Sequence, residues 1–128
     1  MNLSSKLKRI HSVSESNRVN IFIVFNDGFN LLVEGSFRAR MESDLQFTSE
    51  EYVDSNFDPE YLEIINTFLE HQHITQAVAT SDTGSLKLEL ESGLEFESFF
   101  GESDHETWTL ADSRGTIYGS ECGGIIHY

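Results

Sequence analysis

The chain has 128 residues, a length typical of one domain built around one hydrophobic core. Its formal net charge of −14 argues against two classes of partner, because such a body repels nucleic-acid phosphates and anionic membrane surfaces. Hydrophobic residues make up 38% of the chain and aromatic residues 12%, more than a disordered chain carries. The sequence therefore predicts a folded acidic domain that binds neither nucleic acid nor a membrane.

The charge is unevenly distributed along the chain. Residues 1–40 hold six basic and three acidic side chains, whereas residues 41–128 hold nineteen acidic side chains and only Lys87 and Arg114 as bases. This asymmetry has two interpretations: an acidic surface that attracts a basic partner, or acidity that keeps the protein soluble. Charge alone does not decide between them.

Features of the sequence favour the cytoplasm. Cys122 is the one cysteine, so the chain has no internal disulfide, which fits a reducing compartment. The basic residues Lys6, Lys8 and Arg9 are not followed by the apolar run of a secretory signal. The longest apolar stretches are too short to span a bilayer, and we expect a cytoplasmic protein.

The first part of the chain predicts three strands. Residues 1–17 are polar and Ser-rich, and we expect an N-terminal arm or a short strand there, ahead of a single α+β domain over residues 18–128. Asp27-Gly28 is a typical hairpin turn between β-branched and aromatic segments. The expected strands are residues 19–25, 29–34 and 37–41.

One helix is expected, over residues 58–71. Residues 42–57 are acidic and irregular and are interpreted as a connection. Asp58 can cap the helix and Pro59 suits its first turn. An apolar stripe at helical spacing follows, made of Tyr61, Leu62, Ile64, Ile65, Phe68 and Leu69.

Strand patterns return after the helix. They cover residues 74–80, 86–91, 94–97, 107–110, 116–118 and 125–128, separated by turn residues. The segment Phe22–Val33 is similar to Lys87–Ser98, since both read as strand, Gly-containing turn and strand. This repeat suggests two related half-sheets that flank one helix. The predicted fold class is α+β: a mostly antiparallel sheet of about seven to nine strands with one main α-helix packed on it.

Metal and catalytic motifs are weak. His71 and His73 lie two residues apart at the expected helix end, but no Cys-x-x-Cys or His-Glu-x-x-His pattern is present. Cys122 precedes Gly123-Gly124, yet the negative charge around it disfavours the thiolate. No phosphate-binding loop or dinucleotide fingerprint is present. We therefore expect no cofactor, no metal and no enzymatic activity.

The expected binding surface is an acidic face on the second hairpin. Its glutamates alternate with apolar residues, so they point to one side of the sheet, where like charges repel until a cationic partner docks. The alternative is an ordinary solvated face. The candidate contact residues are Glu89, Glu91, Glu95, Glu97, Glu102, Asp104 and Glu106.

Three segments resemble a family of small bacterial domains of uncharacterised function. They are S-G-L-E-F-E-S-F-F at residues 92–100, H-E-T-W-T-L at 105–110 and G-S-E-C-G-G-I-I-H-Y at 119–128. Members typically carry an acidic residue two positions before a Trp, then a Gly-Gly pair and an apolar terminal strand. The matching residues are Glu106, Trp108, Gly123, Gly124 and Ile126, with Phe25, Gly28 and Glu34 in the opening hairpin. Cys122 stands where the family usually has Pro.

Domains of this kind look like immunity proteins of polymorphic toxin systems, including contact-dependent growth inhibition. The resemblance implies that the chain binds and neutralises a cognate toxin C-terminal domain. An acidic inhibitor suits a cationic nuclease, because nucleases need positive surface to hold nucleic acid. Two alternatives stay open: an adaptor or homo-oligomeric assembly subunit, and a small enzyme using His71, His73, His105 or Cys122.

Overall fold

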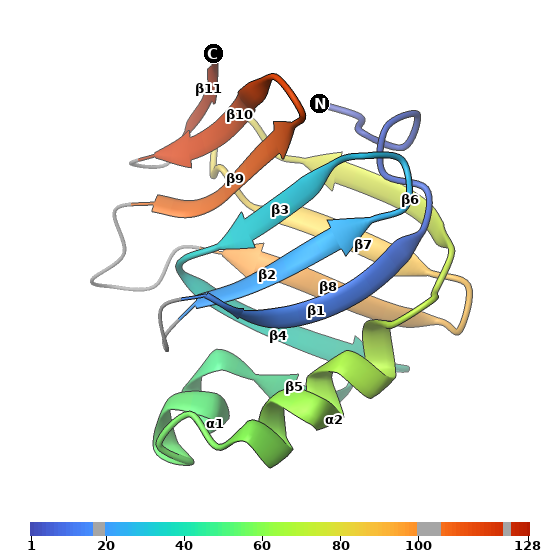
Figure 1. The fold of residues 1–128 in the computed structure, drawn as a ribbon, viewed down its shortest axis with the longest axis vertical. Coiled ribbons are helices and arrows are strands. Elements are labelled where there is room, and N and C mark those ends of the chain that lie inside the picture. Colours follow the sequence, from blue (N-terminus) through green and yellow to red (C-terminus); the bar gives the residue numbers. More distant parts are fainter. Residues whose placement is uncertain (17–19, 100–105, 122–123) are drawn as a thin grey trace.

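The computed structural model describes residues 1–16, 20–99, 106–121 and 124–128. Within them, two antiparallel sheets face each other and two helices lie at one side (Figure 1). The fold class is α+β, as predicted, but the strand number is higher: eleven strands instead of seven to nine. No helix in these ranges is long and apolar enough to cross a membrane.

The first sheet has six strands in the order β1-β2-β3-β9-β10-β11. Their bounds are β1 Ile10–Ser16, β2 Asn20–Phe25, β3 Asn30–Val33, β9 Glu106–Asp112, β10 Gly115–Glu121 and β11 Gly124–His127. The predicted Asp27-Gly28 turn joins β2 and β3, with Gly28 at a φ of 86°, a conformation that side chains with a Cβ rarely adopt. Two three-stranded antiparallel units, β1-β2-β3 and β9-β10-β11, build this sheet by pairing β3 with β9.

The second sheet has five strands in the order β5-β4-β8-β7-β6. Their bounds are β4 Ser36–Met41, β5 Asp44–Thr48, β6 Ile74–Ala79, β7 Leu86–Leu90 and β8 Leu94–Phe99. The two similar segments of the sequence form the hairpins β2–β3 and β7–β8, one in each sheet. The hypothesis of two half-sheets flanking the helix is wrong, because the first sheet combines β1–β3 with β9–β11 and the third predicted strand, β4, pairs in the second sheet.

Alternating burial shows which side of each strand faces the core. In β2, Ile21, Ile23 and Phe25 are buried, and the residues between them are half-buried. In β8, Leu94 and Phe96 are fully buried while the intervening glutamates face outward. A period of two is the direct consequence of the pleat, so one apolar face of each sheet turns toward the other.

The segment predicted to be an irregular connection is ordered. Residues 44–48 form β5, and Ser49–Asp54 form the helix α1, whose first turn is capped by Thr48 Oγ1 accepting from the Glu51 amide at 3.1 Å. A helix of six residues gives too short a periodic pattern to recognise, and Tyr52 is its one buried residue. The structure thus has a second, short helix besides the one main helix that the sequence predicts.

The predicted long helix is α2, Pro59–Leu69. Asp58 Oδ1 accepts from the Glu60 amide at 2.9 Å and Pro59 occupies the first turn, as expected. The helix ends two residues before His71, which has a φ of 64°. Of its apolar stripe, Ile65 and Leu69 are buried, whereas Ile64 is 48% exposed.

Helix α2 closes one side of the sandwich between β1 and β5, the outer strands of the two sheets. Asn66 Oδ1 accepts a 2.8 Å hydrogen bond from the Val13 amide of β1. On the other side, the Phe68 ring lies 5.7 Å from the Phe47 ring of β5. The helix thus supplies apolar contact to both sheets and a polar partner to the edge of one of them.

The N-terminal segment runs along the second sheet before it enters the first. Its strand, β1, corresponds to the short-strand alternative for residues 1–17. Ahead of β1, the Leu3 amide donates to Ala77 O at 2.8 Å and the Ala79 amide donates to Met1 O at 2.8 Å, so this segment covers the edge of β6. Leu3 and Leu7 are buried in the same core as the sheets.

We expect Leu7→Ala to lower the free energy of unfolding by about 2–5 kcal/mol, because it removes a fully buried side chain and leaves a cavity. Lys8→Ala is the matched control, since the neighbouring Lys8 is exposed. Urea unfolding followed by tryptophan fluorescence measures both. Equal midpoints for the two variants would show that the N-terminal segment does not contribute to the core.

Tyr52 gives a second stability prediction. Its side chain is fully buried between Phe57 and Tyr61, and its hydroxyl has no hydrogen-bond partner in the described residues. Desolvation, followed by the nearby Glu15 carboxylate, raises the pKa of Tyr52 above its usual value. Tyr52→Phe should therefore be neutral or stabilising by up to about 1 kcal/mol at pH 7.

The raised pKa also predicts the pH dependence. Above about pH 10 the unfolded chain releases the Tyr52 proton while the folded chain retains it, so stability falls as pH rises. Tyr52→Phe should make this alkaline fall shallower, as measured by urea midpoints between pH 9 and about pH 11. A lower urea midpoint of Tyr52→Phe at pH 7 would instead show that the Tyr52 hydroxyl has a hydrogen-bond partner.

Candidate partner-binding surface

The hairpin β7–β8 has the alternation that the sequence predicts. Leu88, Leu90, Leu94 and Phe96 are buried, and the glutamates between them face away from the core. Cross-strand pairing places Glu89 opposite Glu95 and Lys87 opposite Glu97. The outer side of this hairpin is thus a small charged face.

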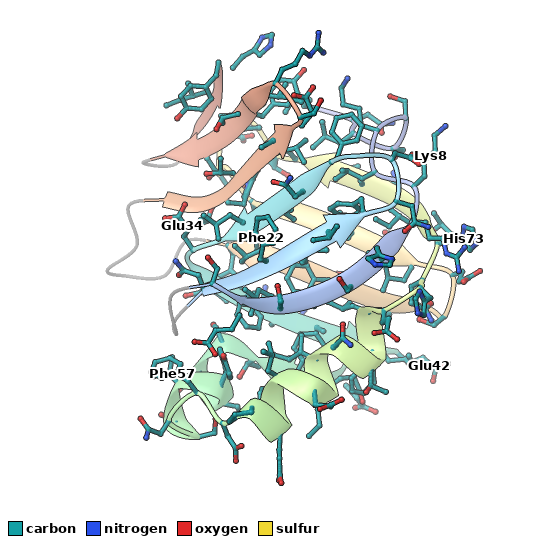
Figure 2. The ribbon with its side chains drawn as sticks, viewed as in Figure 1. Lys8, Phe22, Glu34, Glu42, Phe57 and His73 are labelled. Carbon is teal, nitrogen blue, oxygen red and sulfur yellow. The ribbon has the colours of Figure 1, made fainter. Side chains whose placement is uncertain are left out.

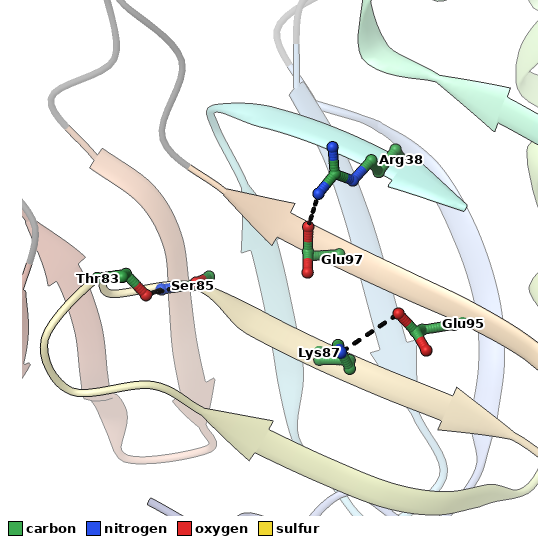
Figure 3. Close-up of polar contacts among 6 residues, drawn as sticks. All are labelled: Arg38, Thr83, Ser85, Lys87, Glu95 and Glu97. Atoms are coloured by element: carbon green, nitrogen blue, oxygen red, sulfur yellow. Dashed lines mark hydrogen bonds and ion pairs between the residues drawn. The ribbon is translucent and has the colours of Figure 1, made fainter. Parts of the chain in front are cut away.

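That face is not a set of four repelling carboxylates, because basic residues lie among them (Figure 3). Arg38 of the neighbouring strand β4 lies opposite Glu97, and its Nη2 is 2.6 Å from Glu97 Oε1. Lys87 Nζ is 3.4 Å from Glu95 Oε1. The expectation of mutual repulsion is therefore wrong for Glu95 and Glu97, since each carboxylate has a cation beside it.

Three cations and three carboxylates share the outer face of β4, β8 and β7, so its formal charge balances. They are Arg38, Arg40, Lys87, Glu89, Glu95 and Glu97. The sequence pattern of the hairpin could not reveal this balance, because two of the cations come from β4, which lies far from the hairpin in the chain. Sheet register decides which charges meet.

The structure describes the remaining predicted contact residues only in part. Glu91 is exposed in the turn after β7, where its Oε1 accepts from the His73 amide at 3.3 Å. Glu106 begins β9 in the other sheet, and its side chain lies outside the described residues. Glu102 and Asp104 also lie outside them. The structure therefore brings together only part of the predicted set.

A second acidic surface has no such balance. We define the helical edge as residues 42–70, which hold the β4–β5 turn, β5, α1 and α2. Figure 2 shows Phe57 and Glu42 on either side of the two helices. This segment contains nine carboxylates and no Lys or Arg: Glu42, Asp44, Glu50, Glu51, Asp54, Asp58, Glu60, Glu63 and Glu70. All except the half-buried Glu70 are exposed.

Part of this acidity stabilises the helices. Asp58 caps α2, and Glu50, Glu51 and Glu60 lie in first turns, where the helix dipole favours negative charge. Asp54 and Glu63 have no such role, since neither carboxylate makes a hydrogen bond or ion pair with the described residues. The charge of the helical edge therefore exceeds what its helices need.

Large apolar side chains are exposed on the same edge. Leu45 of β5 is 56% exposed, Val53 of α1 49% and Ile64 of α2 48%. They make up three of the six large hydrophobic side chains exposed in the described part of the chain. Apolar groups exposed on an acidic surface provide contact area for a cationic protein partner. The sequence contains part of this signal, since residues 42–70 lack Lys and Arg, but only the structure shows which of these side chains are exposed.

The histidines make local contacts in the structure. The His71 ring lies 6.1 Å from the His11 ring and its Nε2 is 3.1 Å from Glu70 Oε1, while the His127 ring stacks 4.8 Å from Tyr118. In the ranges that the structure describes, no three His, Cys, Asp or Glu side chains are grouped to hold a metal ion. Cys122 and His105 lie outside these ranges.

The residues behind the family resemblance have structural contacts. Trp108 is fully buried and its Nε1 donates to Gly84 O at 2.8 Å, which ties β9 to the turn before β7.

No protein-family model matches the chain, and searches of curated proteins and of solved structures find no significant match to it. The family resemblance and the function it implies therefore stay predictions.

The charge pairs of the hairpin face can be measured by double-mutant cycles. We expect a coupling energy of about 1 kcal/mol between Arg38 and Glu97, because their contact is short and the side chains are only 35% and 20% exposed. The longer and more exposed pair Lys87–Glu95 is the control, with an expected coupling below about 0.5 kcal/mol. Urea unfolding of the single and double Gln variants gives both values, and zero coupling for Arg38–Glu97 would contradict the charge balance described above.

Proposed function

We propose that the chain acts by binding a cationic protein through the helical edge, as an immunity protein that neutralises a cognate bacterial toxin domain. The observation that carries the proposal is the unbalanced charge of residues 42–70, with nine carboxylates and no Lys or Arg. The three exposed apolar side chains on the same edge add contact points for a partner. The hairpin face is a weaker candidate, because its charges are balanced.

The chemistry of the partner follows from this surface. An acidic face attracts a positively charged protein over long range and speeds its association. Nucleases that act on nucleic acid carry such positive surface, so a nuclease toxin domain is the class of partner that we propose. Neutralisation requires no catalysis by this chain, and it would take place in the cytoplasm of the cell that makes the toxin.

The direct test uses the polypeptide encoded immediately upstream. Its C-terminal domain is titrated with this protein by calorimetry, and cells producing that domain are scored for growth with and without this chain. One-to-one binding with a dissociation constant on the order of 1 nM, together with restored growth, is the expected result. A folded upstream domain that shows no binding would exclude this pair as toxin and immunity protein.

Charge reversal locates the contact surface. Asp54→Lys/Glu63→Lys should slow association with the toxin domain at least about tenfold at low salt, because it places cations within the helical edge. Glu89→Lys/Glu91→Lys changes the net charge equally on the hairpin and should slow association much less. Stopped-flow or surface plasmon resonance at two salt concentrations measures both variants. A larger effect of the hairpin variant would return the contact surface to Glu89–Glu97.

A second candidate function is assembly by self-association through β11. Within the described ranges, β11 pairs only with β10, and Ile126 and Tyr128 are 38% and 63% exposed beside it. An edge strand with apolar side chains can pair with a second copy. Sedimentation velocity tests self-association through β11. A monomer would exclude it, whereas a dimer that the Ile126→Lys substitution dissociates would support it.

A further inference from the structure

A pocket of about 280 Å³ opens where the outer side of the second sheet meets the helical edge, and residues of both line it. Its walls come from β4, β5, the start of α1 and the end of β8, and they include Arg38, Arg40, Leu45, Glu50 and Phe99. Both arginines lie on one face of β4, two residues apart. The pocket therefore combines two guanidinium groups with apolar side chains.

The two arginines differ in their contacts. Arg38 is occupied: it bonds Glu97 at 2.6 Å, and its guanidinium carbon lies 4.5 Å from the centre of the Phe99 ring. The Arg40 side chain makes no hydrogen bond, ion pair or ring contact with any residue that the structure describes, although Arg40 is half-buried. The Arg40 guanidinium is thus half-buried and has no ion pair among the described residues.

Two carboxylates that the fold brings near Arg40 do not form an ion pair with it. Glu95 lies opposite Arg40 across the β4–β8 ladder, but its carboxylate pairs with Lys87. Glu50 lines the pocket, is exposed, and makes no ion pair with Arg40 in the described part of the chain. A guanidinium held partly out of water needs an anionic partner to recover its hydration energy. An anionic ligand in the pocket would be that partner for Arg40.

We propose that this pocket binds a carboxylate carried on an apolar group. Arg40 donates two parallel hydrogen bonds to the carboxylate oxygens, a geometry in which guanidinium groups are strongest. Leu45, exposed on the pocket wall, contacts the apolar part of the ligand. Binding of a carboxylate in this pocket does not require the toxin partner. The pocket and the proposed immunity function can therefore be tested independently.

Two sources can provide such a group: an acidic side chain of a protein, or a small free carboxylic acid. The net charge of −14 opposes the approach of a free anion, whereas a carboxylate within a docking protein is brought in by the other contacts. We therefore assign the pocket to an acidic side chain next to an apolar residue. The experiment includes both sources.

Three probes test the pocket by NMR titration of the uniformly labelled full chain: hexanoate, hexanamide, and a leucyl-glutamate dipeptide blocked at both ends. We expect hexanoate and the dipeptide to shift the Arg40 Nε–Hε signal and the amides around Leu45, with dissociation constants on the order of 1 mM. Hexanamide should shift them at least about fivefold less, because it lacks the charge that Arg40 binds. Tighter binding of the dipeptide than of hexanoate assigns the carboxylate to a protein side chain, and the reverse assigns it to a small acid.

Variants decide whether Arg40 is the binding group. Arg40→Gln should abolish the carboxylate shifts, whereas Arg114→Gln, which removes an exposed arginine from the β9–β10 turn, should leave them unchanged. Leu45→Asp, at a position that is already 56% exposed, places a negative charge at the pocket wall and should also abolish them. Equal shifts by hexanoate and hexanamide, or shifts that persist in Arg40→Gln, would overturn the proposal.

Discussion

Apolar side chains from two sheets that share no strand meet in one buried layer, and every other element is positioned by that contact. The rings of Phe37, Phe47 and Phe96 lie within about 6 Å of one another on the side of the second sheet, in the same cluster as Ile23 and Trp108 of the first. Because both sheets alternate with a period of two, this layer also fixes which residues face water. The position of the charged faces therefore follows from the packing of the core.

The open sides of the sandwich are closed by segments that are not part of the sheets. Helix α2 covers the side between β1 and β5, and the residues before β1 cover the edge of β6. Each cover supplies hydrogen-bond partners to strand edges that would otherwise be open to other chains. The strand β11 and the outer side of the helices lack such a cover among the described residues, which is why both are candidate contact surfaces.

The distribution of charge separates these surfaces by the kind of partner they fit. On the outer face of the second sheet, Arg38 and Lys87 neutralise Glu97 and Glu95, and Arg40 is left without a partner beside a pocket. The helical edge itself, residues 42–70, holds nine carboxylates and no Lys or Arg. One surface therefore fits a carboxylate and the adjoining one fits cations, a combination that suits a protein partner carrying both signs of charge.

The sequence by itself determined the α+β class, the turn at Gly28, the start of α2 at Asp58-Pro59 and the alternation of the hairpin β7–β8, because each depends on neighbouring residues and on local backbone geometry. It could not give α1, whose six residues are too few for a periodic signal. Only the tertiary structure decided that Arg38 lies opposite Glu97, fifty-nine residues away, and that Arg40 has no partner. Such charge pairs depend on sheet register, which is set by the burial of apolar side chains on the opposite face and leaves no trace in the local pattern of charged residues.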